Sequence, residues 1–310
     1  MNERPATIAD ARRHHASELA RGFSWPECPR WHDDRFWFTD MYTSTLKTVG
    51  DDGIVEIVVD ATGRRRDSSV PIVLGGFGWL PTGQLVVTSM HEKLILIQAD
   101  PDADVLSVYA DLSDLAVGPI NDMVVATDGS LYITQLGFDL FNGDAPVSSP
   151  ILMVDTDGTA SSADAVGPLM GANGIGLSAD ERHLYVAETF ADRLLVMERA
   201  ADGSLSDHRV FAECPGSPDG LGLDADGGVW AALPGLGRVV RFVDGGGATD
   251  VVEVPLDEGR TVACLLGGHD RRTLYVTVGV EVYDFEKSAR EAQASIWTAR
   301  VDVGGGHTRP

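Results

Sequence analysis

Short runs in which apolar and polar residues alternate recur along the chain, and they come in pairs joined by polar turns. One such pair covers residues 173–177 and 184–187, with its turn at Asp180, Glu181 and Arg182. Alternation with a period of two, interrupted by turn residues, predicts a β-hairpin. Segments with helical periodicity are scarce and glycine is abundant, with 35 residues, so the pattern favours an all-β protein rich in turns.

The same hairpin pattern recurs six times along the chain. Setting the six copies in register defines one equivalent position at the start of each first strand. This position is occupied, at intervals of 48, 46, 52, 46 and 44 residues, by Glu27, Gly75, Asn121, Asn173, Asp219 and Ala263. Six copies spaced by about 40 to 50 residues, each with a few short strands, indicate a six-bladed β-propeller.

The repeats predict a single domain, because no linker separates one group of copies from another. We expect residues 1–15 to be a loose leader, residues 16–303 to form the propeller and residues 304–310 to be a frayed tail. A strand within residues 16–25 should pair with the alternating run at residues 295–302, which would close the ring and remove exposed strand edges. Residues 286–294 are rich in helix formers and predict a short helix inserted in the last blade.

Charge and cysteine content narrow the class of protein. The chain has 24 basic and 47 acidic residues, a formal net charge of −23, which excludes a nucleic-acid partner because such proteins need a basic surface. Cys28, Cys214 and Cys264 are an odd number without the spacing of a disulfide framework and indicate a reducing compartment. We find neither a signal peptide nor an apolar run long enough to span a bilayer, and therefore expect a cytoplasmic protein without a membrane partner.

The equivalent positions at the starts of the first strands should converge on the propeller axis. Four of the six carry a side-chain oxygen, namely Glu27, Asn121, Asn173 and Asp219, and none is Lys or Arg. Hard divalent cations such as Ca²⁺ and Mg²⁺ take carboxylate and amide oxygens, whereas Zn²⁺ more commonly takes His and Cys. The pattern predicts one cation site that is open to substrate on one side. The glycines after Asn173 and Asp219 should let the backbone turn tightly into the channel.

Four motifs make a similarity to a known family specific: Glu-Cys-Pro-Arg-Trp at residues 27–31, Asn-Asp at 121–122, Asn-Gly-Ile-Gly-Leu-Ser-Ala-Asp at 173–180 and Ser-Pro-Asp-Gly-Leu at 217–221. Over nearly its whole length the chain resembles the family of gluconolactonase, regucalcin (the senescence marker protein) and luciferin-regenerating enzyme. The resemblance implies a six-bladed propeller with one divalent ion on its axis, held by Glu27, Asn173 and Asp219. Ca²⁺ is the first expectation, with Zn²⁺, Mg²⁺ or Mn²⁺ as alternatives. It further implies that Asn121 helps to hold the substrate and that Asp219 is the catalytic acid and base.

Two positions depart from the family pattern. Members that act on sugar lactones carry an Arg two residues before the position of Asn121, where this chain has Pro119. This departure weakens the expectation of an aldonolactone substrate. The first motif usually has Gly where this chain has Cys28, which we interpret as a small buried residue.

The loops after the second strands should line the mouth of the channel, on the same face as the starts of the first strands. They carry Tyr42, His91, Phe138 and Phe190, which we expect to contact the substrate, and the rim positions are mostly apolar with no Arg or Lys among them. Apolar mouths suit ligands that bury hydrocarbon, so we expect a lactone or ester that is more hydrophobic than a sugar acid. For each of these side chains, packing between blades is the alternative, and for His91 a structural or solvated role.

The sequence therefore predicts a metal-dependent lactone hydrolase, in which the cation polarises the carbonyl and Asp219 transfers protons to and from water. A serine nucleophile is not expected, because no Gly-x-Ser-x-Gly motif is present. Two alternatives stay open: a phosphotriesterase-like hydrolase similar to diisopropylfluorophosphatase, and a non-catalytic calcium-binding propeller. The natural substrate, the physiological metal and the oligomeric state are left open by the sequence.

Overall fold

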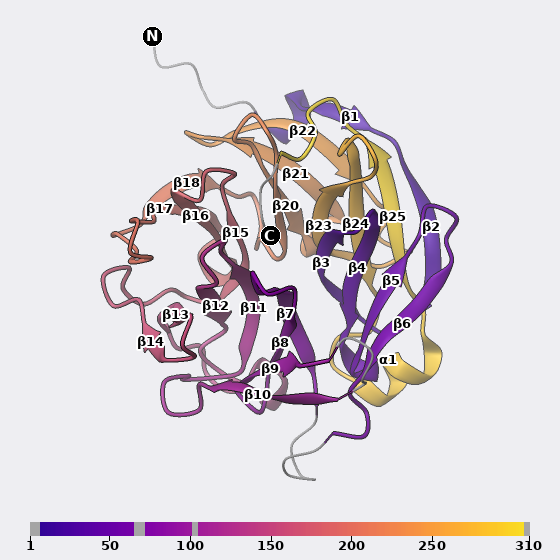
Figure 1. The fold of residues 1–310 in the computed structure, drawn as a ribbon. Coiled ribbons are helices and arrows are strands. Elements are labelled where there is room, and N and C mark those ends of the chain that lie inside the picture. Colours follow the sequence, from indigo (N-terminus) through magenta and orange to yellow (C-terminus); the bar gives the residue numbers. More distant parts are fainter. Residues whose placement is uncertain (1–6, 65–71, 101–104, 307–310) are drawn as a thin grey trace.

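Six β-sheets are arranged around a common axis in a computed structural model of the chain, which describes residues 7–64, 72–100 and 105–306 (Figure 1). Four sheets consist of four strands that are consecutive in the chain, and each runs from an inner strand at the axis to an outer strand at the surface. The predicted six-bladed β-propeller is confirmed.

The strands of each blade follow the chain from the inside outward. Blade 1 consists of β3 (Pro26–His32), β4 (Arg35–Asp40), β5 (Thr45–Val49) and β6 (Val55–Asp60). Blade 2 consists of β7 (Leu74–Trp79), β8 (Leu85–Ser89), β9 (Leu94–Gln98) and β10 (Leu106–Asp111). Blade 3 consists of β11 (Ile120–Val125), β12 (Leu131–Gln135), β13 (Leu152–Val154) and β14 (Ala160–Ser162). Blade 4 consists of β15 (Ala172–Leu177), β16 (His183–Glu188), β17 (Arg193–Glu198) and β18 (Arg209–Glu213). Blade 5 consists of β19 (Leu221–Leu223), β20 (Val229–Leu233), β21 (Arg238–Val243) and β22 (Gly247–Glu253). Blade 6 consists of β23 (Arg260–Gly267), β24 (Thr273–Gly279) and β25 (Ala294–Arg300), completed by β2 (Ala16–Phe23).

The ring is closed by strands from opposite ends of the chain. β2 pairs antiparallel with β25, from Ala16 opposite Ala299 to Phe23 opposite Ala294. The chain then passes directly from β2 into β3, the inner strand of blade 1, so that blades 6 and 1 are covalently continuous. The first and last blades therefore cannot separate unless the pairing of β2 with β25 is broken.

Both chain ends are more ordered than the sequence suggested. Residues 8–14, which we expected in a loose leader, form η1 (Ile8–Asp10) and β1 (Arg12–His14), and β1 pairs parallel with β22 on the outside of blade 5. His14, expected to lie in a solvated tail, places Nε2 2.9 Å from Oδ1 of Asp250. Residues 304–306, expected to fray, instead pack on blades 5 and 6, since the Gly305 N–H donates to the Arg271 carbonyl at 2.8 Å. Residues 1–6 of the expected leader and residues 307–310 of the expected tail lie outside the described residues.

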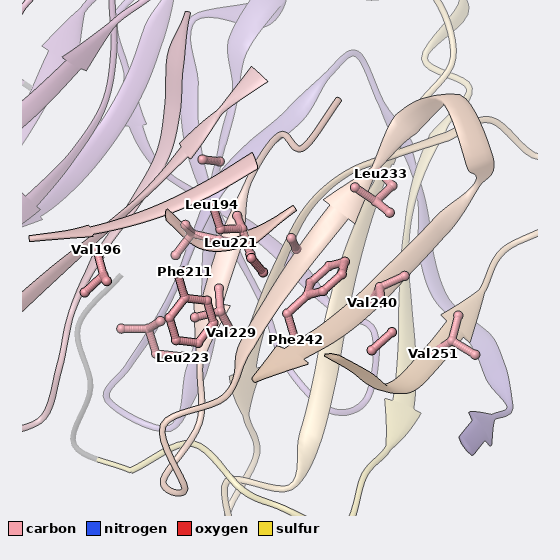
Figure 2. Close-up of a cluster of buried hydrophobic side chains, with 14 of the residues drawn as sticks. Leu194, Val196, Phe211, Leu221, Leu223, Val229, Leu233, Val240, Phe242 and Val251 are labelled. Atoms are coloured by element: carbon pink, nitrogen blue, oxygen red, sulfur yellow. The ribbon is translucent and has the colours of Figure 1, made fainter. Parts of the chain in front are cut away.

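The hydrophobic core of the described residues contains six wedges, each between two neighbouring blades, and a seventh, smaller cluster formed by Trp25, Met41, Val73, Met90 and Val262. Figure 2 shows the wedge between blades 4 and 5, where Leu194 and Phe211 of blade 4 meet Leu221, Val240 and Phe242 of blade 5. Alternate residues of each strand face one wedge or the other, because successive side chains in a strand point to opposite faces of the sheet. Each blade is therefore apolar on both faces, and the wedges fix the angle between blades.

A short helix, α1 (Phe285–Glu291), interrupts blade 6 at the place predicted from its helix-forming residues. Its N-cap is Asp284, whose side chain accepts a hydrogen bond from the Lys287 N–H at 2.8 Å. Ser288 donates to the carbonyl of Ser24 at 2.8 Å, which ties the helix to the entrance of blade 1. Among the described residues, no helix is both long and apolar enough to cross a membrane.

We expect Phe23→Ala to destabilise the fold by about 3–5 kcal/mol, because it leaves a cavity where the ring closes. Phe23 is buried in the wedge between blades 6 and 1, with its ring edge-to-face against Phe38 at 4.9 Å. Urea unfolding would measure the loss. The control is Ile57→Ala on the outer strand of blade 1, where the side chain is 61% exposed and the expected change is below about 0.5 kcal/mol. Equal losses for the two variants would contradict this account of ring closure.

Candidate metal centre and active site

A β-bulge marks the repeat position in five of the six blades. In blade 1 the pairing of the first two strands shifts between Glu27 and Arg30, and in blade 3 it shifts between Ile120 and Met123. Equivalent shifts occur in blades 2, 4 and 6. A bulge bends the strand and re-aims the side chain that it carries. The side chain of the repeat residue therefore does not follow the regular alternation of side-chain directions in the rest of its strand.

The four oxygen-bearing residues meet at the axis, as the repeat register predicted. Asn121 Nδ2 donates to Asn173 Oδ1 at 2.8 Å. Asn173 is in turn close enough to the Asp219 carboxyl group to lower its pKa by hydrogen bonding, and Asp219 acts electrostatically on Glu27. Residues from blades 1, 3, 4 and 5 thus form one cluster. Glu27, Asn173 and Asp219 are each half-buried.

The electrostatics of this cluster favour a bound cation. Burial, and then repulsion from Asp219, raises the pKa of Glu27 well above its usual range. Burial likewise raises the pKa of Asp219 to about 7, against the lowering effect of Asn173. The negative charge of Asp122 adds to the repulsion on both groups. Two carboxylates in such surroundings resist being ionised together unless positive charge lies between them.

The donor set fits a hard divalent cation. It comprises the carboxylates of Glu27 and Asp219 and the amide oxygens of Asn121 and Asn173, which are the oxygen ligands that Ca²⁺ and Mg²⁺ take. Within residues 7–64, 72–100 and 105–306, no group of three or more His, Cys, Asp and Glu side chains is placed to hold a metal. A cation at the axis would therefore depend on the two amides, a set that suits Ca²⁺ better than Zn²⁺.

Threonine hydroxyls hold the backbone of the ligand positions from behind. Thr39 donates to the carbonyl of Glu27 at 3.2 Å, Thr88 to that of Asn121 at 2.9 Å, and Thr134 to that of Asn173 at 2.7 Å. The last two of these bonds run from one blade to the next. Sequence reasoning missed this role, although a threonine near the end of the second strand in four of the six copies was visible (Thr39, Thr88, Thr134 and Thr277).

Carboxylates at the ends of second strands hold the start of the neighbouring first strand. The Asp40 carboxylate, which is fully buried, accepts hydrogen bonds from the backbone N–H groups of Ser24 and Trp25, both at 2.9 Å. In blade 4 the Glu188 carboxylate accepts from the Met170 N–H at 2.8 Å. These bonds fix the segments that lead into Glu27 and Asn173. Nothing in the sequence distinguished the two acids from turn residues.

The glycines after Asn173 and Asp219 serve the site in a different way from the one expected. Neither adopts a left-handed backbone conformation. A Cβ on Gly174 would lie 2.6 Å from the Leu221 nitrogen, and a Cβ on Gly220 would lie 2.4 Å from the Ala263 Cβ. These glycines are needed because neighbouring inner strands approach one another closely around the axis, and the expected tight turn is not their role.

Cys28 is the residue at the site that does adopt a left-handed conformation, with φ of 50°. Its backbone N–H donates to Glu27 Oε2 at 3.1 Å, and its side chain is buried, as the sequence suggested. A left-handed conformation is unstrained for glycine and uncommon for a residue with a Cβ. The bulge thus explains why glycine is usual at this position in the family pattern, and why cysteine there carries some backbone strain.

The expected rim residues fall into two aromatic groups and one polar pair. The ring of Tyr42 stacks between Trp25 and Phe285, and its hydroxyl donates to the Val282 carbonyl at 2.9 Å. Burial, and then the charges of Glu27 and Asp219, raises the pKa of Tyr42, so this residue lies near the cluster.

The second aromatic group is formed by Phe138 and Phe190, whose ring centroids are 5.3 Å apart. Phe138 is buried, whereas Phe190 is 41% exposed on η4 (Thr189–Ala191). His91 lies with Nδ1 3.9 Å from Oδ2 of Asp139, and burial lowers its pKa. Of these side chains, Phe190 is the most accessible, while Tyr42 is held by protein contacts on both ring faces. Substrate contact by Tyr42, His91, Phe138 and Phe190 stays a prediction.

The fold and the cluster together define a six-bladed propeller with an acidic, oxygen-rich site on its axis. Residues 25–280 match the family described as the SMP-30/Gluconolactonase/LRE-like region. The match covers most of the chain, which therefore belongs to this family. The resemblance inferred from the four motifs is confirmed.

Curated relatives of known name include lactonases. The chain is 37% identical to L-arabinolactonase of Azospirillum brasilense over 116 residues, covering 36% of this chain and 37% of that protein. It is 30% identical to a pentonolactonase of Haloferax volcanii over 194 residues, covering 59% of this chain and 62% of that protein. The matched regions thus span less than two thirds of these relatives.

Solved structures share the fold. Regucalcin of Agrobacterium tumefaciens, described as a calcium-binding protein, superposes with a TM-score of 0.75 at 21% sequence identity, covering 96% of this chain and 97% of that one. At this identity the likeness extends to the architecture of the propeller.

We expect Gly174→Ala to destabilise the protein by about 1–3 kcal/mol, because the new Cβ would overlap backbone atoms of the neighbouring inner strand. That Cβ would lie 2.6 Å from the Leu221 nitrogen and 2.7 Å from the Asp219 carbonyl oxygen. The matched control is Gly235→Ala on η5 (Pro234–Leu236), where a Cβ meets nothing within 4 Å. Denaturant unfolding of both variants measures the difference. A loss as small for Gly174→Ala as for the control would show that the inner strands can move apart without cost.

Proposed function

We propose that this protein is a divalent-cation-dependent hydrolase of lactones, with Glu27, Asn173 and Asp219 as ligands to a single cation. The observation that carries the proposal is the convergence of two half-buried carboxylates and two amides from four different blades. Membership of a family that includes named lactonases supports the reaction class. Ca²⁺ is the proposed ion, because all three ligands bind through oxygen and none is a nitrogen or sulfur donor.

A bound cation would supply Lewis-acid polarisation of the lactone carbonyl. Asp219 accepts a proton from the attacking water while the water oxygen bonds to the carbonyl carbon. The bond from that carbon to the ring oxygen then breaks, and Asp219 returns the proton to the departing alkoxide, which gives the hydroxy acid. Glu27 and Asn173 hold the geometry, and Asn121, fixed by its hydrogen bond to Asn173, orients the substrate.

The proposed substrate is a lactone with an apolar or aromatic substituent. Support comes from Phe190, which is 41% exposed beside Phe138, and from Pro119, which stands where family members that act on sugar lactones have Arg. An exposed aromatic ring gains free energy by covering hydrocarbon and little by covering sugar hydroxyls.

Removal of divalent cations with a chelator should abolish lactone hydrolysis, and Ca²⁺ should restore it.

Asp219→Asn should lower kcat by at least about 100-fold, because the amide cannot accept the proton from water. Isothermal titration of the same variant with Ca²⁺ should still detect binding, since an amide oxygen remains. The matched variant Glu27→Gln, which alters a ligand without the proposed proton transfer, should weaken Ca²⁺ binding more than it lowers kcat at saturating Ca²⁺. Full activity after exhaustive chelation would refute the proposed function, and hydrolysis of organophosphates in place of lactones would favour the phosphotriesterase alternative.

Phe190→Ala should raise KM for aromatic γ- or δ-lactones by about 10-fold, the effect of losing roughly 1.4 kcal/mol of apolar contact. Its KM for aldonolactones should change little, because sugar hydroxyls make no comparable contact. The control Val210→Ala removes an apolar side chain that is 39% exposed on β18, the outer strand of the same blade and away from the mouth. Steady-state kinetics on both substrate classes measure the effect. An equal rise in KM for both classes would argue against an apolar subsite at Phe190.

A further inference from the structure

An arginine is buried inside the ring close to the candidate metal centre. Arg30 is 4% exposed and lies on β3, three residues after Glu27. Its Nη2 donates to Asp122 Oδ1 at 2.7 Å, and Asp122 is 7% exposed on β11, directly after Asn121. Neither residue of this pair is among the predicted site residues. Each of the two residues is thus close in the chain to one of the four residues of the axial cluster.

The guanidinium group of Arg30 connects three blades. Besides Asp122, it donates from Nε to the Phe77 carbonyl of blade 2 at 2.9 Å and from Nη2 to the Met123 carbonyl of blade 3 at 2.5 Å. Nη1 donates to the carbonyl of Pro29 in its own strand at 2.8 Å. Only arginine has a planar fork with five donors, so lysine cannot reproduce this set of bonds.

Arg30 and Asp122 can meet across blade 2 because Gly76 has no side chain. A Cβ on Gly76 would lie 2.5 Å from Asp122 Oδ1 and 2.2 Å from the Met123 nitrogen. The acceptor carboxylate is also held by its own strand, because Asp122 Oδ1 accepts from the Met123 N–H at 2.8 Å. Blade 2 has Gly75 at the repeat position and Gly76 directly after it. The absence of side chains there leaves room for the contact between blades 1 and 3.

We propose that Arg30 and Asp122 are positioning residues for the axial cation site: they hold the strands of Glu27 and Asn121 at a fixed separation and keep the charge of Asp122 neutralised. This inference rests on the proposed function. A charged residue buried beside a cation site is costly unless paired, and the pair supplies that compensation within hydrogen-bond distance. Residues that orient metal ligands from outside the coordination shell typically change metal affinity by about 10- to 100-fold when altered.

A second buried pair in the same molecule provides a matched control. Arg241 on β21 places Nε 2.6 Å from Oδ2 of Asp224, and the two residues are 7% and 3% exposed. Asp224 follows β19, at the opposite end of this strand from Asp219, and its carboxylate accepts from the Gly228 N–H at 2.9 Å in the turn of blade 5. The chemistry and burial resemble those of Arg30 and Asp122, while the location is away from the axial cluster.

The experiment compares Arg30→Lys and Asp122→Asn with Arg241→Lys and Asp224→Asn in the full chain. Each protein is stripped of metal and titrated with CaCl₂ by isothermal calorimetry, and its unfolding in urea is measured without metal. Arg30→Lys and Asp122→Asn should each weaken Ca²⁺ binding by about 10- to 100-fold. Asp122→Asn should have the larger effect, because it leaves the positive charge of Arg30 uncompensated beside the cation. The two control variants should lose comparable stability but change Ca²⁺ affinity less than about threefold.

A double variant, Arg30→Met with Asp122→Leu, keeps the test decisive if the single variants fold poorly. Replacing a buried ion pair by apolar residues of similar volume is often tolerated, so this protein should fold, yet it should still bind Ca²⁺ more weakly than the wild type. If the Arg30 and Asp122 variants bind Ca²⁺ as the Arg241 and Asp224 variants do, the pair is structural and the inference is overturned. If the wild-type protein binds no divalent cation, the proposed function fails and this inference fails with it.

Discussion

Repulsion between two half-buried carboxylates is the constraint on which the candidate site depends. Glu27 and Asp219 face the same point on the axis from blades 1 and 5, and burial with their mutual charge raises the pKa of Glu27 well above its usual range. A protein that only had to fold would gain by replacing one of them with an apolar residue, since buried like charges oppose folding. Their joint presence is understandable if a divalent cation normally lies between them, with the amides of Asn121 and Asn173 completing its surroundings.

The propeller provides the rigidity that such a cluster needs. Apolar wedges between the blades fix the position of each sheet relative to its neighbours. Glu27, Asn121 and Asn173 stand on inner strands, and hydroxyls of Thr39, Thr88 and Thr134 bond to their carbonyls, while Asp219 lies two residues before β19. Sites supported by packed strands hold their geometry more closely than sites built on loops. The loops are consequently left to form the rim, where Phe190 and its neighbours can differ between relatives without disturbing the axis.

Much of the fold and part of the candidate site could be predicted from the sequence. The alternation of period two and the six copies of one hairpin determined the architecture, because a repeat unit that buries both its faces must stack on copies of itself. Register between copies was enough to bring Glu27, Asn121, Asn173 and Asp219 to one point. Equivalent residues of the repeats occupy equivalent positions around the axis, so these residues could be grouped without knowledge of any contact.

Other features depended on contacts between blades that no local pattern encodes. The bulges at the repeat positions, the left-handed backbone of Cys28 and the close approach that requires Gly174 all arise where inner strands crowd around the axis. The ordering of residues 8–14 depends on pairing with the outer edge of β22 in blade 5, which lies far away in the chain. Arg30 would suit a solvated strand end by its sequence alone. In the tertiary structure Arg30 pairs with Asp122, because Gly76 has no side chain that would keep blades 1 and 3 apart.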